Sequence, residues 1–287
     1  MQSEPSAKLT TASAGSFRMG LVGRGIRLSR TPAMHEAEAA TLGMTCRYEL
    51  IDRDVDPVHD LPEILSRAEA EGFAGLNITY PYKQDVIAHV HHLSDAAKRV
   101  GAVNTVVFRD GLRFGHNTDF WGFKESLRTG LPGVELDDVL LIGAGGAGAA
   151  LAHAMADMGA ARLRIHDTRG GAALSLAKGI AVAEPARDLA EAAAGASGIV
   201  NATPVGMAKM PGTPIAQTLL EARHWVADII YFPLETELLR TASALGCRTL
   251  NGEGMAVFQA VRAFQLFTGH SADPCGMRAT FRAMGAV

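Results

Sequence analysis

The chain has 287 residues, of which 48% are hydrophobic and 20% are charged, with a formal net charge of −3. This composition is typical of a soluble globular protein with two domains, and no basic block indicates a nucleic-acid or anionic-membrane partner. Cys46, Cys247 and Cys275 are far apart and predict neither a metal site nor a redox pair. This cysteine usage indicates a reducing compartment, so we expect a cytoplasmic protein, and no apolar run is long enough to cross a bilayer.

Residues 1–16 are mostly small or polar and lack the charged start and apolar core of a signal peptide, so we expect a loose extension. The residues that follow predict alternating elements: strands at 17–23, 46–51 and 75–79, and helices at 33–42, 61–70 and 81–91. Two more strands, 103–108 and 112–116, are joined by Asp110-Gly111, a hairpin turn signal. This order predicts an α/β domain with an antiparallel addition near its end.

A helix at 120–127 leads to a break rich in glycine and proline at 129–133, where we expect a second domain to begin. Helical patterns separate most of its predicted strands, which is typical of a doubly wound parallel sheet. These strands lie at 139–142, 163–166, 180–183, 198–201, 225–229 and 248–250. Helices at 255–268 and 273–284 end the chain, and we expect them to pack back on the first domain.

A glycine-rich turn lies between the strand at 139–142 and an alanine-rich helical stretch. Gly143, Gly145 and Gly148 have the G-x-G-x-x-G spacing, in the strand–turn–helix context of a dinucleotide-binding site. The first glycine permits the tight turn, the second lets the backbone approach a pyrophosphate, and the third lets the helix pack on the strand. The N–H groups at the start of the helix then face the anion.

Asp167 ends the next strand, about twenty residues after the last glycine, where a carboxylate can accept hydrogen bonds from the adenosine ribose. Such a carboxylate repels a 2′-phosphate, so it favours NAD over NADP. Arg169 keeps NADP open as a cofactor, because a nearby arginine can bind that phosphate.

Polar side chains also lie at or near the ends of strands in the first domain. Asn77 and Thr79 end one strand and Lys83 follows them, and ligands bind at strand ends in open α/β sheets. Taken alone, Lys83 would be a solvated lysine and Asp119 would be a helix N-cap. Asn104 lies inside an apolar strand, where a buried amide must be either a structural tie or a ligand contact.

Taken together, these stretches resemble the shikimate dehydrogenase family from about Gly20 to the C-terminus. The matching motifs occur in the family's order: Ser29-Arg30-Thr31-Pro32-Ala33-Met34-His35, Asn77-x-Thr79-x-Pro81-x-Lys83, Gly101-Ala102-Val103-Asn104-Thr105, Asn117-Thr118-Asp119, Gly143-Ala144-Gly145-Gly146-Ala147, Asn201-Ala202-Thr203-Pro204-x-Gly206-Met207 and Gly252-x-Gly254-Met255-x-x-x-Gln259. The resemblance implies a substrate-binding catalytic domain at 17–119, completed by C-terminal helices at 255–287, and a Rossmann NAD-binding domain at 120–254. A cleft between these domains would hold the site.

The resemblance also implies a role for each matching residue. Lys83 and Asp119 correspond to the catalytic pair beside the reacting hydroxyl. Ser29 and Thr31, with Tyr231 nearby, would hold the substrate carboxylate. The groups that would bind ring hydroxyls are Asn77, Thr79, Asn104 and Gln259. The expected cofactor-binding residues are Gly143, Ala144, Gly145, Gly146, Ala147, Thr203, Ile229, Gly252 and Met255, together with Asp167 and Arg169.

The chemistry of these residue types agrees with the resemblance. Oxidation of a secondary alcohol needs a proton acceptor and a hydride acceptor at one carbon. Nicotinamide accepts the hydride, and a lysine in a partly closed cleft can act as the base. Asp119 would orient Lys83 and bind a hydroxyl, and which of the two carries the proton stays open.

Two departures from the family pattern narrow the expected activity. Thr31 stands where a second serine is common, and Asp167-Thr168-Arg169 stands where NADP-using members commonly have Asn-Arg-Thr. The chain therefore looks like the NAD-dependent quinate/shikimate dehydrogenases of quinate catabolism, which oxidise a ring hydroxyl to a 3-dehydro ketone. The alternatives are an NADP-dependent biosynthetic shikimate dehydrogenase of the shikimate pathway, a non-catalytic dinucleotide-binding paralogue, and an amino-acid or folate-type dehydrogenase.

The remaining polar clusters favour structural roles. His35-Glu36 lacks a second histidine four residues on, so we expect a pair on a helix surface. His89, His91 and His92 lack a cysteine or acidic partner at ligand spacing, so we expect a solvated helix end and no metal. The expected partners are small molecules, with no nucleic acid and no membrane, and the expected state is a monomer or a homodimer.

Overall fold

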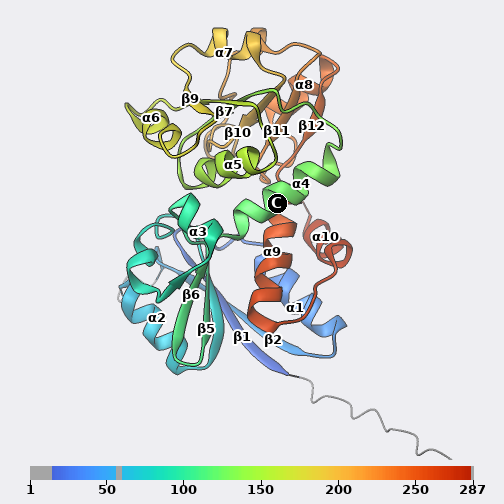
Figure 1. Ribbon diagram of the computed structural model, residues 1–287. Coiled ribbons are helices and arrows are strands. Elements are labelled where there is room, and N and C mark those ends of the chain that lie inside the picture. Colours follow the sequence, from blue (N-terminus) through green and yellow to red (C-terminus); the bar gives the residue numbers. More distant parts are fainter. Residues whose placement is uncertain (1–14, 56–59, 286–287) are drawn as a thin grey trace, which may run out of the picture.

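The computed structural model describes residues 15–55 and 60–285, which form two lobes, each built around a six-stranded sheet (Figure 1). Two α/β units were predicted from the sequence, and the fold class is confirmed. Residues 1–14 of the expected N-terminal extension lie outside the described residues, and Ser16 belongs to the first strand. The domain boundaries themselves stay a prediction.

The first sheet has the strand order β2-β1-β3-β5-β6-β4. β1, β2 and β3 are parallel, and β5 runs antiparallel to both β3 and β6. The turn between β5 and β6 has Asp110 and Gly111 at positive φ, as the hairpin signal predicted. The strands are β1 (Ser16–Gly23), β2 (Thr45–Asp52), β3 (Phe73–Ile78), β4 (His92–Leu93), β5 (Thr105–Arg109) and β6 (Leu112–His116). The helices are α1 (Thr31–Thr41), α2 (Leu61–Ala70), the 3₁₀ helix η1 (Asp85–His89) and α3 (Asp95–Val100).

The second sheet is parallel throughout, with the order β12-β11-β10-β7-β8-β9. β7 lies where the strand order reverses, and ligands bind at such a switch point. Val139 and Leu141 of β7 face one core, and Leu140 and Ile142 face the other. The strands are β7 (Asp138–Ile142), β8 (Arg162–His166), β9 (Ala183–Pro185), β10 (Gly198–Asn201), β11 (Trp225–Asp228) and β12 (Arg248–Leu250). The helices are α5 (Gly146–Asp157), α6 (Ala172–Ala177), α7 (Leu189–Gly195), η2 (Gln217–Leu219) and α8 (Glu237–Ala244).

Two helices cross closely where the lobes meet: α4 (Thr118–Gly130) and α9 (Glu253–Thr268) (Figure 1). A Cβ on Gly122 would lie 2.8 Å from the backbone nitrogen of Gln259, and one on Gly254 would lie 2.2 Å from Ser126 Oγ. The crossing therefore depends on glycine in both helices. α9 also contacts β3 and β5, and α10 (Pro274–Ala283) contacts α1, so the C-terminal helices return to the first lobe as predicted.

Two elements of the structure differ from those predicted from the sequence. The helix expected at 81–91 is a turn followed by the short η1, because the apolar residues of this stretch include β-branched Val86, Ile87 and Val90, which are weak helix formers. The strand expected at 180–183 begins only at Ala183.

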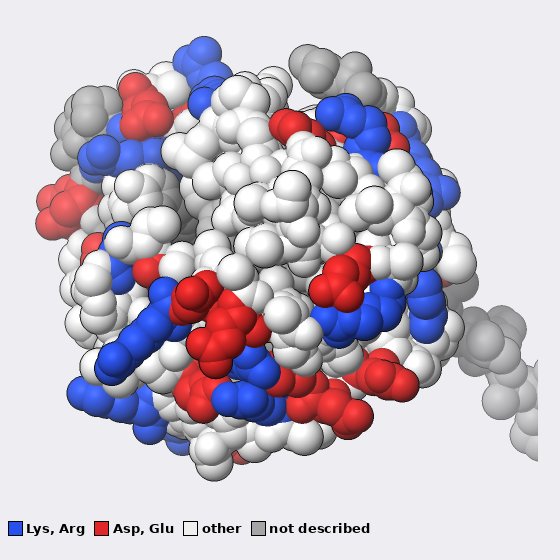
Figure 2. Space-filling model, turned by 90° about the horizontal axis from the view of Figure 1, so that it is seen from above, with Lys and Arg blue, Asp and Glu red and all other residues white. Residues whose placement is uncertain are grey.

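Surface charges of both signs are mixed on the face shown in Figure 2, where Lys and Arg lie next to Asp and Glu around a largely uncharged centre. Within residues 15–55 and 60–285, no helix is both long and apolar enough to cross a membrane. The same residues contain no group of three or more His, Cys, Asp or Glu side chains arranged to hold a metal ion.

His35 of α1 is buried, so the expected surface pair is wrong for this residue, whereas Glu36 is exposed. The His35 ring lies 4.9 Å from the Tyr48 ring and 5.8 Å from the Phe264 ring, measured between centroids. Neither ring nitrogen has a hydrogen-bond partner among the described residues. Burial therefore lowers the pKa of His35 to about 3, because the charged imidazolium would lose its hydration.

We predict that His35 makes the fold sensitive to acid. Its pKa in the folded protein lies below the unfolded value near 6.5, so its contribution to stability is present above pH 6.5 and is lost as the pH falls toward 3. Between pH 7 and pH 5 this group alone costs about 2 kcal/mol of unfolding free energy. Urea unfolding at both pH values should show a smaller loss for His35→Leu than for the wild type. Phe267→Leu removes no titratable group from the same core, so its unfolding free energy should fall between pH 7 and pH 5 by the same amount as that of the wild type.

A buried network joins the ends of β10 and β11. Asp228 Oδ1 accepts from Asn201 Nδ2 at 3.1 Å and from the Ile230 N–H at 3.0 Å, and its Oδ2 accepts from Thr236 Oγ1 at 2.8 Å. Asn201 Oδ1 in turn accepts from the backbone N–H and the hydroxyl of Thr203. Burial raises the pKa of Asp228, and these hydrogen bonds oppose that shift. The network therefore fixes the loop that carries Thr203.

We predict that the number of acceptors at position 228 sets the stability of this region. Asp228→Ala removes an acceptor from three buried donors, of which only Asn201 Nδ2 keeps another, the Val205 carbonyl, so it should lower the free energy of unfolding by about 3 kcal/mol. Asp228→Asn keeps an acceptor for Asn201 and Ile230 and removes only that of the Thr236 hydroxyl, so its loss should be smaller, about 1 kcal/mol. Urea unfolding measures both values, and equal losses for the two variants would contradict this account.

Candidate functional site

A cleft of about 1000 Å³ lies between the lobes and is lined by residues of both. Every residue expected to act in catalysis or substrate binding lines it: Ser29, Thr31, Asn77, Thr79, Lys83, Asn104, Asp119, Tyr231 and Gln259. The expected cofactor residues in its wall are Ala147, Thr203, Ile229, Gly252 and Met255. Gly143, Ala144, Gly145, Gly146, Asp167 and Arg169 lie outside this lining, at the turn after β7 and the end of β8.

Lys83 and Asp119 form an ion pair inside the cleft. Lys83 Nζ donates to Asp119 Oδ2 at 2.7 Å, and the side chains are 21% and 10% exposed. Asn117, rather than Asp119, caps α4, because its side chain accepts from the Phe120 N–H. The readings of Lys83 as a solvated lysine and of Asp119 as an N-cap are therefore both wrong.

Asn77 and Asn104 are held by hydrogen bonds within the protein. Asn77 Oδ1 accepts from the Tyr48 hydroxyl at 2.7 Å, and its Nδ2 donates to Thr105 Oγ1 at 3.0 Å. Asn104 Oδ1 accepts from the Thr118 N–H at 2.7 Å, and its Nδ2 donates to Thr118 Oγ1 at 3.0 Å. Both amides also line the cleft, so they are structural ties that remain within reach of a ligand.

The corner formed by Ser29, Thr31 and Tyr231 is the expected carboxylate site. Ser29 Oγ accepts from the Thr31 N–H at 3.3 Å, at the start of α1. Tyr231 follows β11 and lines the same cleft from the second lobe, with 39% of its surface exposed. Desolvation and then the carboxylate of Asp119 raise the pKa of Tyr231, which therefore stays a neutral hydroxyl donor at physiological pH.

The glycine turn has the shape that its sequence pattern predicts. Gly143 has φ of 106°, and a Cβ on Gly148 would lie 1.9 Å from the Gly143 carbonyl oxygen. Both positions therefore require glycine. α5 begins at Gly146, so its free N–H groups face the space beside this turn.

Asp167 is tied to this turn, and Arg169 is tied to Asp167. The carboxylate accepts from the Ala144 N–H at 2.7 Å and from Arg169 Nη2 at 2.9 Å. The hydrogen bond from the Arg169 side chain, followed by those from backbone N–H groups, holds the pKa of Asp167 far below its ordinary value despite partial burial. The structure thus brings an ionised carboxylate and an exposed guanidinium to the same edge of the turn.

The remaining cofactor candidates form the inner wall of the cleft. Asn201 Oδ1 holds Thr203 by accepting two hydrogen bonds from it, one from the Thr203 N–H at 2.9 Å and one from the Thr203 hydroxyl at 2.7 Å. A Cβ on Gly252 would lie 2.2 Å from the Ile229 carbonyl oxygen, so the chain passes this point only with glycine. Met255 follows in the first turn of α9 and is buried.

Sequence reasoning missed the residues that support the expected site. Thr105 and Thr118 belong to two of the matching motifs but were given no role, so their positions carried a signal. Tyr48 carried none, because its contact with Asn77 depends on both β2 and β3 pairing with β1. Asp228 ends an apolar strand and is buried. Its position after that strand was the only sign in the sequence that it needs hydrogen-bond partners.

Comparison with known proteins gives one consistent family. Residues 21–106 match the family model described as the shikimate dehydrogenase substrate binding domain. A shikimate dehydrogenase (NADP(+)) of Streptomyces avermitilis is 49% identical over 276 residues, covering 92% of this chain and 94% of its own. A quinate/shikimate dehydrogenase (NAD(+)) of Corynebacterium efficiens is 47% identical and covers 93% and 98%. The structure of quinate dehydrogenase from Corynebacterium glutamicum in complex with NAD superposes with a TM-score of 0.90 at 44% identity, covering 94% and 99%. The chain therefore belongs to the shikimate dehydrogenase family.

Proposed function

We propose that this protein is an NAD-dependent dehydrogenase that interconverts a ring hydroxyl of quinate or shikimate with the 3-dehydro ketone. One observation carries the proposal: the ion pair of Lys83 and Asp119 lies in a cleft beside the glycine turn. The Lys83 Cδ atom is 4.0 Å from the Cβ position of Gly146, at the start of α5. An alcohol bound at the amine would therefore face a nicotinamide bound along the second lobe. The names of the relatives support quinate and shikimate as substrates.

NAD fits the second lobe on three counts. The turn after β7 requires glycine at Gly143 and Gly148, and α5 presents its N–H groups there. Asp167 lies where ribose hydroxyls can donate to it. Thr203 and Met255 line the cleft at the expected nicotinamide end. When bound, the nicotinamide supplies the hydride acceptor.

The residues of this chain would hold the substrate and move its proton. The hydroxyls of Ser29 and Thr31 would bind the carboxylate, and Asn77 and Asn104 would bind ring hydroxyls from the first lobe. We assign the proton of the reacting hydroxyl to the Lys83–Asp119 pair as a unit, since Lys83 Nζ donates to Asp119 Oδ2 at 2.7 Å. Their fixed geometry would bring a proton acceptor to the hydroxyl of the carbon that loses hydride.

NADP is the second candidate cofactor. Arg169 is exposed and lies within 3 Å of Asp167, so its guanidinium can turn toward a 2′-phosphate. The relative from Streptomyces avermitilis carries NADP in its name. A cytoplasmic location and a state of monomer or homodimer stay predictions from the sequence.

Replacement of Lys83 should remove turnover while leaving nucleotide binding. Lys83→Ala breaks the ion pair to which the proton of the reacting hydroxyl is assigned, so kcat for quinate or shikimate should fall by at least about 100-fold. NAD affinity, measured by calorimetry, should change little because the glycine turn after β7 stays intact.

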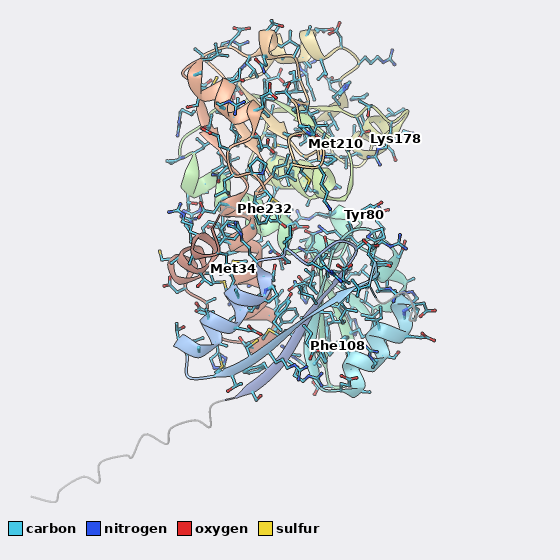
Figure 3. The ribbon with its side chains drawn as sticks, turned by 180° about the vertical axis from the view of Figure 1, so that it is seen from behind. Met34, Tyr80, Phe108, Lys178, Met210 and Phe232 are labelled. Carbon is cyan, nitrogen blue, oxygen red and sulfur yellow. The ribbon has the colours of Figure 1, made fainter. Side chains whose placement is uncertain are left out.

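Lys178 provides the matched control, since it is an exposed lysine of the second lobe, away from the cleft (Figure 3). Lys178→Ala should leave kcat at the wild-type value. Substantial turnover by Lys83→Ala would remove the lysine from the mechanism.

The end of β8 should set cofactor choice, with opposite effects of its two charges. Asp167→Ala removes the group that repels a 2′-phosphate, so the NADP-to-NAD ratio of kcat/KM should rise by about tenfold, equivalent to about 1.4 kcal/mol. Arg169→Ala leaves the carboxylate unpaired, so the same ratio should fall. Steady-state kinetics of both acids with both nucleotides measures this, and a clear wild-type preference for NADP would contradict the proposed cofactor.

A further inference from the structure

Arg30 lies between the two hydroxyl residues of the expected carboxylate corner and is only 5% exposed. Its Nη1 donates to the Phe281 carbonyl at 2.9 Å, and its Nη2 donates to the Gly285 carbonyl. These contacts join the start of α1 to the end of α10 and the residues after it. The guanidinium is therefore fixed in place by neutral acceptors.

Two aromatic rings enclose the same guanidinium. Arg30 Cζ lies 4.4 Å from the centroid of the Phe232 ring and 4.5 Å from that of Phe281. Figure 3 shows Phe232 where the two lobes meet, and its ring lies 5.3 Å from that of Tyr231. Aromatic faces and carbonyl oxygens favour a cation at this position, but they carry no net negative charge.

No carboxylate of the described residues forms an ion pair with Arg30. The acids of this region have other partners: Asp119 pairs with Lys83, and Glu253 pairs with Arg282. Arg18 offers a contrast, because it also stacks on a phenylalanine ring but pairs with Glu49. A buried cation without a counterion is costly, so a counterion supplied by a ligand would stabilise it.

The charge of Arg30 reaches the cleft. Arg30 lines the cleft together with Ser29, Thr31 and Tyr231. Its charge also opposes the rise in the pKa of the Tyr231 phenol, so its field extends to that hydroxyl. Between low-dielectric walls, the same field would act on an anion bound at the corner.

We propose that Arg30 determines specificity for anionic substrates: its buried guanidinium, which has no ion-pair partner among the described residues, supplies the positive charge that complements a carboxylate bound at Ser29 and Thr31. This inference depends on the proposed function, because it requires a carboxylate at that corner. Arg30 is a positioning residue, which acts on the substrate's charged end and not on the reacting carbon. Neutral hydrogen-bond donors alone would accept an ester or amide of the same alcohol more readily.

The test compares each acid with its uncharged methyl ester. We would measure kcat/KM with NAD for quinate, shikimate and both esters, in the wild type and in Arg30→Met and Arg30→Lys. Arg30→Met should lower kcat/KM for the acids by at least about tenfold, equivalent to about 1.4 kcal/mol, and change that for the esters by less than about threefold. Arg30→Lys, which keeps the charge, should retain most of the preference for the acid.

Arg18→Met is the matched control, because it also removes an arginine stacked on phenylalanine but lies outside the cleft lining. It should leave the acid-to-ester ratio unchanged, and thermal unfolding of each variant would show that it is folded. Equal losses for acids and esters in Arg30→Met would overturn the inference, because they would show a purely structural role. If the wild type oxidised neither acid with either nucleotide, the proposed function would fail, and the role of Arg30 with it.

Discussion

The contact between α4 and α9 is the constraint on which the site depends. The two helices approach so closely that Gly122 and Gly254 have no room for a side chain. α4 carries Asp119 at its first turn, and α9 carries Met255 and Gln259 on the surface that faces the cleft. One helix crossing therefore sets the distance between the ion pair and the wall that would hold a nicotinamide. Such rigid support is what catalytic geometry needs, because small displacements of reacting groups cost large factors in rate.

Charge in the cleft and at the glycine turn beside it is arranged in three different ways. Lys83 and Asp119 form an ion pair at 2.7 Å, and Asp167 and Arg169 form another beside the glycine turn. Arg30 alone among these groups has only neutral partners in the described part of the chain. The first pair suits proton transfer, the second suits discrimination between nucleotides, and the single cation suits an anionic substrate. Each arrangement matches one of the three tasks of an alcohol dehydrogenase that acts on an acid.

The sequence predicted the fold class because its signals were local. The spacing of Gly143 and Gly148 reports steric needs within one turn, and the alternation of apolar runs reports the layers of each sheet. The placement of His35 was not predictable in this way, since alanine-rich α1 shows no strongly apolar face and the histidine is buried by α9, more than two hundred residues later. The tie between Tyr48 and Asn77 depends on strand register, which local pattern does not specify.

The return of the C-terminal helices to the first lobe has a consequence for biosynthesis. One core joins Met34 and Met44 with Phe264 and Met277, residues from opposite ends of the chain. Translation releases the first of these segments long before the last, and domains generally fold as units while synthesis proceeds. The second lobe is continuous in sequence from β7 to β12, so it can fold as soon as that stretch leaves the ribosome. The lobe that is synthesised first therefore completes its hydrophobic core last. Until then its sheet exposes an apolar face to which chaperones can bind.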